Sequence, residues 1–360
     1  MKRDGKTATG VQRWYCYSCH TSTTHRIDTT AKDLASFLDW LLSRKRQADL
    51  PGAGRTFRRK IEKCWNIWPI APVTGEVCRV VYVDGIYIAR NLVVLIACND
   101  LHVLSWYMAR SENSSAWTAL LSRIPTPDLV VTDGGVGFAK AVKKLWPNTL
   151  VQRCLFHVFC QVKGYITSHP KLPAGVELYG LSKELLHVKT LKQADMWVQK
   201  YQAWVLRWED FLLEKTIIEG REFLTHDRLI KARNGLNRLV SAGTLFNFLD
   251  PELTKTEPLP ATNNRIEGGI NALLRQMLRD HRGLSKMRRV KAVFWWCYMH
   301  TECPASPAEI LKSMPTDRDI ERLYQIYARD NTKESDSPSW GDAIVWEDFH
   351  TSEPYWTGWD

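Results

Sequence analysis

The apolar residues near the N-terminus recur with helical spacing in two stretches. The first predicts an amphipathic helix over residues 31–46, and the second, after a turn rich in Pro and Gly, predicts a helix over residues 55–65. The polar side of the second helix is basic and carries Arg55, Arg58, Arg59 and Lys63. Two helices of which the second is basic are typical of a helix-turn-helix that binds DNA; a solvated basic helix of a small helical domain is the alternative.

From about Val77 the pattern changes to short runs of β-branched and aromatic residues, which predict strands. We expect strands at residues 80–84, 91–98, 102–108, 128–133 and 149–153, and helices at 114–124 and from the Gly-rich turn 134–135 to about 146. This order predicts an α/β fold with a mixed five-stranded sheet flanked by helices. Asp84 and Asp133 are expected at the carboxyl ends of two strands, where such sheets bind ligands.

The second half of the chain is mainly helical in pattern. Residues 154–249 show helical periodicity and almost no strand pattern, so we expect an α-helical block there. After a Pro-rich linker at 251–260, an apolar stripe over residues 266–278 predicts a further helix, with Glu267 beside the stripe. Beyond Cys303 the chain is acidic and contains Pro and Ser, which predicts a loosely ordered tail.

The charge of the chain indicates a polyanionic partner. Lys and Arg number 49 against 39 Asp and Glu, a net charge of +10. Residues 1–70 are strongly basic, whereas residues 331–360 are acidic. A second basic run follows Glu267, contains only Asp280 as an acid, and suits contacts with the DNA backbone through Arg275, Arg279, Arg282, Arg288 and Arg289.

The nine cysteines are odd in number and spread thinly, which favours a reducing cytosol over a disulfide framework. The apolar runs are too short for a membrane span or a signal peptide, so we expect a cytoplasmic protein without membrane association. Cys16 and Cys19 form one of the two Cys-x-x-Cys knuckles of a zinc ribbon. His20 and His25 could complete a Zn²⁺ site, and the alternative is a pair of free thiols.

Three acidic residues have the chemistry of a metal site. Two aspartates at adjacent strand ends and a glutamate on a helix packed against the same sheet offer the hard oxygen ligands that Mg²⁺ prefers. Two such ions can drive the in-line displacement of a phosphodiester. Taken singly, each acid also has an ordinary role, since Asp before Gly favours turns and Glu suits the first turn of a helix.

The motifs resemble those of the DDE transposases of bacterial insertion sequences, in the family related to eukaryotic Mutator elements. They run in order from Tyr82-Val83-Asp84-Gly85 and Val130-Val131-Thr132-Asp133-Gly134-Gly135 to Gln152-Arg153-Cys154-Leu155-Phe156-His157 and Asn263-Asn264-Arg265-Ile266-Glu267-Gly268-Gly269-Ile270-Asn271. The resemblance covers the chain from about Trp14 to Cys303.

This resemblance implies an RNase H-like core that cleaves and joins DNA ends, with Asp84, Asp133 and Glu267 as ligands of Mg²⁺ or Mn²⁺. It places Cys154 and His157 beside the active site, where His157 could contact a phosphate or the nucleophile; a core cysteine and a histidine satisfied by the backbone are the alternative. Related proteins commonly begin with a complete zinc ribbon, so the missing first knuckle predicts a shortened or misassigned start. The expected partners are double-stranded DNA, as terminal repeats and target, and further copies of the chain on that DNA, in a bacterial nucleoid.

The patterns and the resemblance together divide the chain into six parts. These are a partial zinc-ribbon-like segment (1–25), a helix-turn-helix region (26–72), the first part of the RNase H-like core (73–163), an α-helical insertion (164–260), the last helix of the core with its basic extension (261–303), and an acidic tail (304–360). Two rivals stay open: a domesticated or truncated DNA-binding protein without catalysis, and an RNase H-like nuclease that cleaves without joining.

Overall fold

The computed structural model describes residues 1–24 and 28–330. Contacts divide the described residues into two units, one formed by residues up to 67 and 305–314, the other by residues 68–304 and 315–330. Among the described residues, no helix is both long and apolar enough to cross a membrane.

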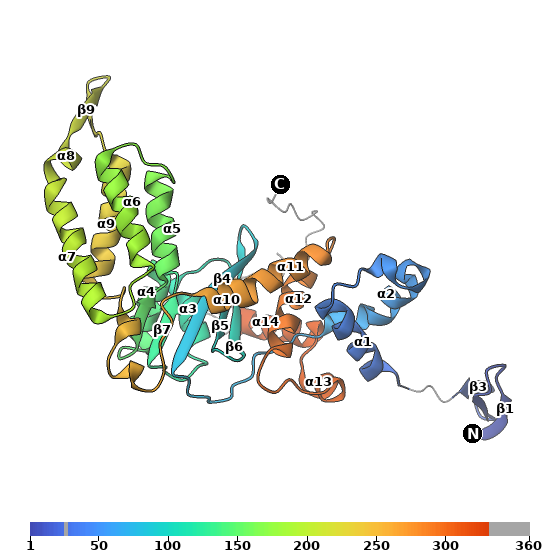
Figure 1. Cartoon of the computed structure of the whole chain (residues 1–360). Coiled ribbons are helices and arrows are strands. Elements are labelled where there is room, and N and C mark those ends of the chain that lie inside the picture. The colour runs from blue at the N-terminus through green and yellow to red at the C-terminus, as the bar shows by residue number, and fades with distance from the viewer. Residues whose placement is uncertain (25–27, 331–360) are drawn as a thin grey trace. The chain divides into compact units, whose positions relative to one another are not determined.

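The first unit contains a small antiparallel sheet and a group of short helices (Figure 1). Its elements are β1 (Lys2–Lys6), β2 (Gln12–Cys16), β3 (Thr21–Thr24), α1 (Thr30–Leu42), 3₁₀ turns at Gln47–Asp49 and Pro51–Gly54, α2 (Arg55–Ile61), a 3₁₀ turn at Glu62–Asn66, and α13 (Pro307–Ser313). The ring of Phe37 on α1 meets that of Trp65 edge-on at 4.8 Å, and both are buried. The two predicted helices therefore exist, but each is shorter than its pattern, since Ser43 has extended backbone and Ile61 leads into the 3₁₀ turn.

The second unit is built on a five-stranded sheet, as predicted. Its strands are β4 (Val80–Ala89), β5 (Leu92–Cys98), β6 (Val103–Ala109), β7 (Leu129–Thr132) and β8 (Leu150–Arg153). Their order in the sheet is β6-β5-β4-β7-β8, in which β4, β5 and β6 are antiparallel and β4, β7 and β8 are parallel. The mixed sheet follows from this connectivity, because hairpins join the first three strands and helices cross over to the last two.

Helices pack against both faces of the sheet, and alternate residues of β4 contribute to each. Val81 and Val83 join the buried cluster with α3 (Ser114–Leu121) and α4 (Val136–Leu145). Because successive side chains of a strand point to opposite faces, Tyr82 and Asp84 face the other side. That side carries α10 (Asn264–Ile266) and α12 (Lys286–Met299), which both contact β4.

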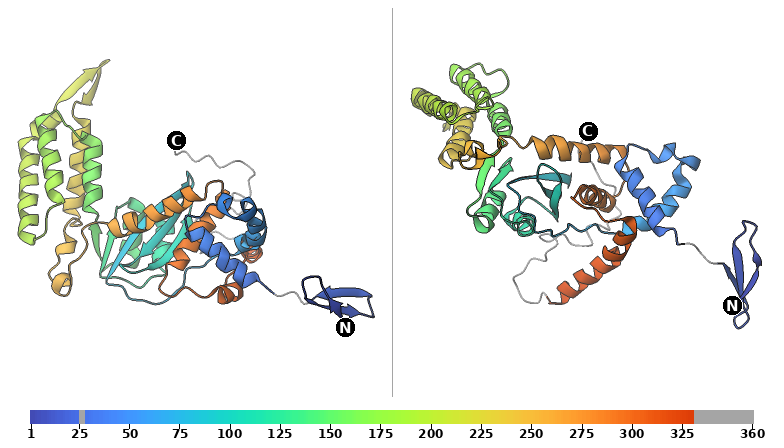
Figure 2. Two further views of the ribbon diagram at one scale, coloured as in Figure 1. Left: turned by 45° about the vertical axis from the view of Figure 1, so that its right-hand side comes forward. Right: turned by 60° about the horizontal axis from the view of Figure 1, so that its bottom comes forward.

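A helical bundle is inserted between β8 and α10 (Figures 1 and 2). It comprises α5 (Leu155–Ile166), α6 (Pro173–Leu185), α7 (Leu191–Arg207), α8 (Glu209–Leu213) and α9 (Asp227–Ser241), followed by 3₁₀ turns at Asn247–Leu249 and Leu253–Lys255. Its core includes the stacked rings of Trp197, Tyr201 and Trp204 on α7.

The prediction of an α-helical block over residues 154–249 misses two short strands. A hairpin of β9 (Lys215–Ile218) and β10 (Arg221–Leu224) extends from the bundle (Figure 1). Glu219 and Gly220 both have positive φ, the backbone of a two-residue hairpin turn. The strands were missed because all eight of their residues are exposed, so no alternation of apolar and polar residues marks them.

The expectation of a loosely ordered tail from Cys303 is wrong for residues 307–330, which form α13 and α14 (Asp317–Asp330). Ser306 and Glu309 form a capping box at the start of α13, and Ile310 is buried. At the start of α14, Asp317 pairs with the buried Lys291 of α12. These local signals outweigh the acidic composition; residues 331–360 lie outside the described part.

Candidate active site

Asp84 lies on β4, and Asp133 directly follows the neighbouring parallel strand β7. Val83 of β4 pairs with Thr132 of β7, so the following residues, Asp84 and Asp133, stand side by side. Asp84 does not end its strand as predicted, because β4 continues to Ala89 along β5. Asp84 instead follows the last residue pair of the parallel β4–β7 pairing, because β7 ends at Thr132.

Glu267 comes from a helix that changes geometry at this point. It begins a π-helical turn, Glu267–Asn271, between α10 and α11 (Ala272–Asp280). From the same turn, Asn271 Nδ2 donates a hydrogen bond of 2.6 Å to Asp84 Oδ2. Just before the helix, the buried Asn263 donates from Nδ2 to Val83 O at 3.1 Å. The helix is thus fastened to β4 on both sides of Glu267.

The acidic residues influence each other electrostatically. Burial and the neighbouring charge of Asp133 raise the pKa of Asp84 to about 7, and the charges of Glu267 and Glu112 add to this. Burial also raises the pKa of Asp133, against the opposing effects of His157 and Arg153. Since the charges of Asp133, Glu267 and Glu112 all disfavour ionisation of Asp84, the four carboxyls form one electrostatic cluster.

His157 lies on the first turn of α5, against Glu267. Its Nδ1 is 2.9 Å from Glu267 Oε1. Hydrogen bonding to Cys154 and then to Glu267 raises the pKa of His157 to about 10. The donor atoms of Cys154, His157 and Glu267 all lie within 4.8 Å of one another, a spacing that could hold a metal ion. Neither aspartate belongs to a group of three donors that close among the described residues.

Two residues of this region are not among the predicted site residues. Asn271 is fully buried, and in the sequence it stands out only as the last residue of the motif that contains Glu267. Glu112 precedes α3, and its carboxyl lies so close to Gly85 that a Cβ there would be 2.6 Å from Glu112 Oε1. The glycine after Asp84 is the one signal in the sequence, because a strand glycine can mark a close approach by another group.

The basic residues expected to bind DNA lie in two places. In the first unit, Arg55, Arg58 and Arg59 are exposed, whereas Lys63 forms an ion pair of 2.9 Å with Asp33. In the second unit the basic run is not one helix, because α11 ends at Asp280 and α12 begins at Lys286. Of its arginines, Arg275, Arg279 and Arg282 are exposed and Arg288 and Arg289 are half-buried.

The cysteine knuckle occupies the turn between β2 and β3. Hydrogen bonds from Cys19, first from its backbone, lower the pKa of the Cys16 thiol to about 7. Tyr15 OH and His20 Nδ1 are 3.1 Å apart. Neither cysteine belongs to a group of three donors among the described residues, and His25 lies outside them.

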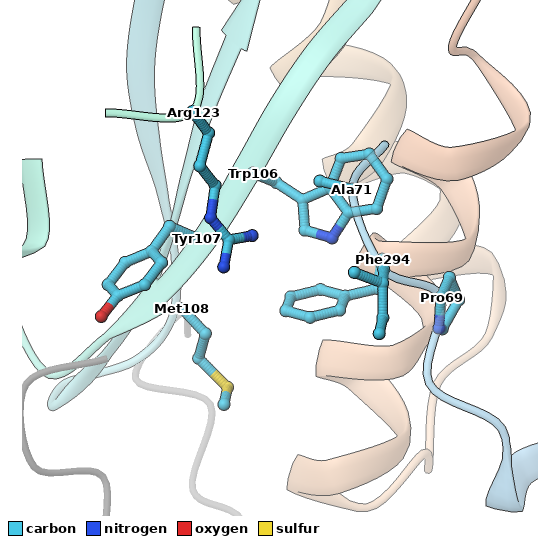
Figure 3. A pocket seen from close by; sticks show the side chains of 8 residues that line it. Pro69, Ala71, Trp106, Tyr107, Met108, Arg123 and Phe294 are labelled. Carbon is cyan, nitrogen blue, oxygen red and sulfur yellow. The ribbon is translucent and has the colours of Figure 1, made fainter. Parts of the chain in front are cut away.

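Two further features of the second unit contain none of the candidate site residues. Glu76, His102 and Glu302 also bring three donor atoms within 4.8 Å, and His102 Nε2 is 2.7 Å from Glu76 Oε2. A small pocket, mostly apolar and containing none of the acidic residues, is lined by Pro69, Ile70, Ala71, Trp106, Tyr107, Met108, Arg123 and Phe294 (Figure 3).

Comparison with known proteins shows similarity to transposases. The chain is 24% identical over 205 residues to a probable transposase for an ISRM3-like insertion sequence element of Sinorhizobium fredii, covering 51% of this chain and 50% of the relative. It is 24% identical over 214 residues to the transposase for ISRM3 of Rhizobium meliloti (54% and 52%), and 29% identical over 99 residues to that for IS6120 of Mycolicibacterium smegmatis (26% and 29%). The chain spans about half the length, or less, of these curated relatives.

The similarity extends to a family model. The model of the Mutator family of transposases matches residues 79–217. The resemblance noted from the motifs is therefore confirmed: this region matches the Mutator family, and the chain is similar to transposases of bacterial insertion sequences. The matched residues include Asp84, Asp133, Cys154 and His157 and stop before Glu267.

Proposed function

We propose that the protein is a DDE transposase that cleaves DNA at the ends of an insertion sequence and joins those ends to target DNA. Asp84, Asp133 and Glu267 would hold the divalent cation. The observation that supports this best is the pairing of β4 with β7, which makes the two aspartates neighbours, while the charge of Glu267 raises the pKa of both.

The residues fit a divalent cation. Carboxylate oxygens are the ligands that Mg²⁺ and Mn²⁺ prefer. Carboxyls whose pKa values are raised by burial and by neighbouring carboxylates gain most from a positive charge placed among them. The three acids need not lie within one group of close donors, because two ions about 4 Å apart would each have their own ligands. When bound, the cation would favour attack on the phosphodiester and stabilise the leaving oxygen.

The surrounding residues orient these ligands. β4 and β7 fix the aspartates, and the π-helical turn presents Glu267 to them. His157 holds the Glu267 carboxylate by its ion pair, and we expect a proton on its ring near neutral pH because its pKa is about 10. Arg153 contributes a positive charge beside Asp133.

We infer that the rest of the chain binds DNA. The sheet with its flanking helices would be an RNase H-like core interrupted by the helical bundle, and α1 and α2 would form a helix-turn-helix region that binds the terminal repeats. The exposed arginines of α2 and of the run after Glu267 would contact phosphates. The protein would act as a homo-oligomer on DNA in the bacterial cytoplasm, at the nucleoid.

Zinc is not part of this catalytic proposal. The thiolates of Cys16 and Cys19 are soft ligands, whereas the acidic cluster suits hard cations. We expect a Cys16→Ser/Cys19→Ser double variant to join pre-cut ends at the wild-type rate. Stoichiometric zinc in the purified protein, lost in the double variant together with joining, would contradict this.

The proposal is tested with Asp84→Asn, Asp133→Asn and Glu267→Gln, each of which keeps the size of the side chain and removes its charge. Each variant should lose Mg²⁺-dependent joining of pre-cut element ends and still bind those ends. Asp128→Asn, a change at an exposed aspartate outside the cluster, is the matched control and should keep joining. Substantial joining by any of the three variants removes that residue from the site.

The same assay separates the rival functions. A nuclease on this fold would cleave the DNA without joining it, and a DNA-binding protein without catalysis would bind ends and do neither. Either result with the wild-type protein would replace the transposase proposal.

A further inference from the structure

Asn271 makes a contact that the catalytic proposal does not use. Its side chain is 0% exposed, and its Nδ2 donates to Asp84 Oδ2 at 2.6 Å. The other oxygen of the carboxylate, Oδ1, accepts a hydrogen bond of 2.8 Å from the backbone N–H of Gly85. Both oxygens of Asp84 therefore have a fixed donor, which sets the rotation of the carboxylate.

The π-helical turn brings Asn271 to this position. The N–H of Ala272 bonds to the C=O of Glu267, so the turn contains one residue more than an α-helical turn. Asn271, the last residue of the turn, reaches Asp84 of β4, while Glu267 begins the turn. One turn of helix thus supplies both an acidic residue of the cluster and the donor that orients Asp84.

A purely structural role for Asn271 explains these contacts less well. Asn263 already fastens the helix to the sheet, since its Nδ2 donates to Val83 O and its N–H donates to Cys154 Sγ at 3.2 Å. Those bonds go to a backbone oxygen and a thiol, neither of them a carboxylate of the cluster. Asn271 instead donates to a carboxylate, and its own Oδ1 is buried without a hydrogen-bond partner among the described residues.

We propose that Asn271 is a positioning residue that holds the Asp84 carboxylate toward Asp133 and thereby increases the affinity of the acidic cluster for a divalent cation. This inference rests on the proposed function, because it takes the cluster as the cation site. Groups that orient metal ligands typically change metal affinity by about 10–100-fold when they are removed.

The test uses Asn271→Leu, which keeps the approximate volume and removes the donor, together with Asn271→Ala. Asn264→Ala, at an exposed asparagine of the same helix, is the matched control. The midpoint of thermal unfolding is measured on the full chain without DNA as Mn²⁺ is added, and the rise gives the dissociation constant for Mn²⁺. We expect this constant to increase about tenfold or more in both Asn271 variants and to stay within about twofold in the control.

Activity on pre-cut ends gives a second measurement. The Mg²⁺ concentration for half-maximal joining should increase by a similar factor, while the rate at saturating Mg²⁺ should fall far less. An unchanged Mn²⁺ dissociation constant in Asn271→Leu, or in Asn271→Ala if the leucine variant does not fold, would overturn the inference. So would a loss of rate that saturating Mg²⁺ does not restore.

The two proposals fail in different ways. If the cluster is not the cation site, the wild-type protein and Asp84→Asn will show the same response to Mn²⁺, whatever the Asn271 variants do. If only the role of Asn271 is wrong, Asp84→Asn will lose the response and the Asn271 variants will keep it.

Discussion

Removing the charge of Asp84 should stabilise the protein when no divalent cation is bound. Burial and the adjacent carboxylates raise the pKa of this carboxyl from 3.8 to about 7. A pKa raised in the folded state means that the folded chain holds the proton more tightly than the unfolded chain does. The ionised carboxylate therefore opposes folding, by an amount that grows between pH 3.8 and about 7 and is complete above that range.

The size of the effect follows from the shift. Each pKa unit corresponds to about 1.4 kcal/mol, so the shift sets an upper limit of about 4 kcal/mol on the destabilisation above pH 7. Because solvent and small relaxations reduce such values, we expect Asp84→Asn to gain about 2 kcal/mol, or a rise of about 4–8 °C in the unfolding midpoint. The new amide can still be satisfied, since turning the Asn271 side chain presents its Oδ1 to the added N–H group.

Thermal unfolding in the presence of a chelator checks this prediction. Asp84→Asn should unfold at a higher temperature than the wild type above pH 7, and the difference should shrink toward zero below about pH 4. Asp128→Asn, at an exposed aspartate just before β7, should show no gain. No gain above pH 7, or an equal gain at both pH values, would refute the electrostatic reasoning.

Two further predictions concern charges outside the cluster. Asp317→Ala should lower the free energy of unfolding by about 3 kcal/mol in urea denaturation, because it leaves the ammonium group of Lys291, 1% exposed, without its carboxylate; Asp317→Asn should cost less, and equal losses would contradict this. Replacing Arg55, Arg58 and Arg59 with alanine should weaken binding to element ends and reduce the log–log salt slope by about one per lost phosphate contact. Unchanged affinity and slope would mean that α2 does not contact the DNA backbone.

The elements of the second unit were predictable where side-chain burial follows a simple period. β5 is buried at every residue, and its sequence is a continuous apolar run. Apart from the end of β4, the strands of the sheet begin and end within one residue of their predicted bounds. β4 was predicted five residues too short, because Gly85 and the exposed Tyr87 interrupt its apolar run beyond Asp84. The hairpin β9–β10 buries nothing, so no period was present to find.

The candidate site was predictable only in part for a related reason. Asp84 and Asp133 follow apolar runs, and parallel pairing then makes them neighbours. Glu112 and Asn271 contribute through tertiary contacts, which spacing in the sequence does not encode. The π-helical turn was equally hidden, because the apolar stripe over residues 266–278 follows ordinary α-helical spacing and carries no mark of a wider turn.

Because the bundle lies between β8 and α10 in the chain, the acidic cluster is completed late during synthesis. Asn271 and Asp84 are in hydrogen-bond contact although 187 positions separate them in the chain. Helices α5 to α9 contact mainly one another and are made of local segments, which form early, whereas contacts between distant segments form late. A chain that has left the ribosome only as far as the bundle therefore has both aspartates but neither Glu267 nor the amide that orients Asp84. The acidic cluster is complete only when nearly the whole core has been synthesised.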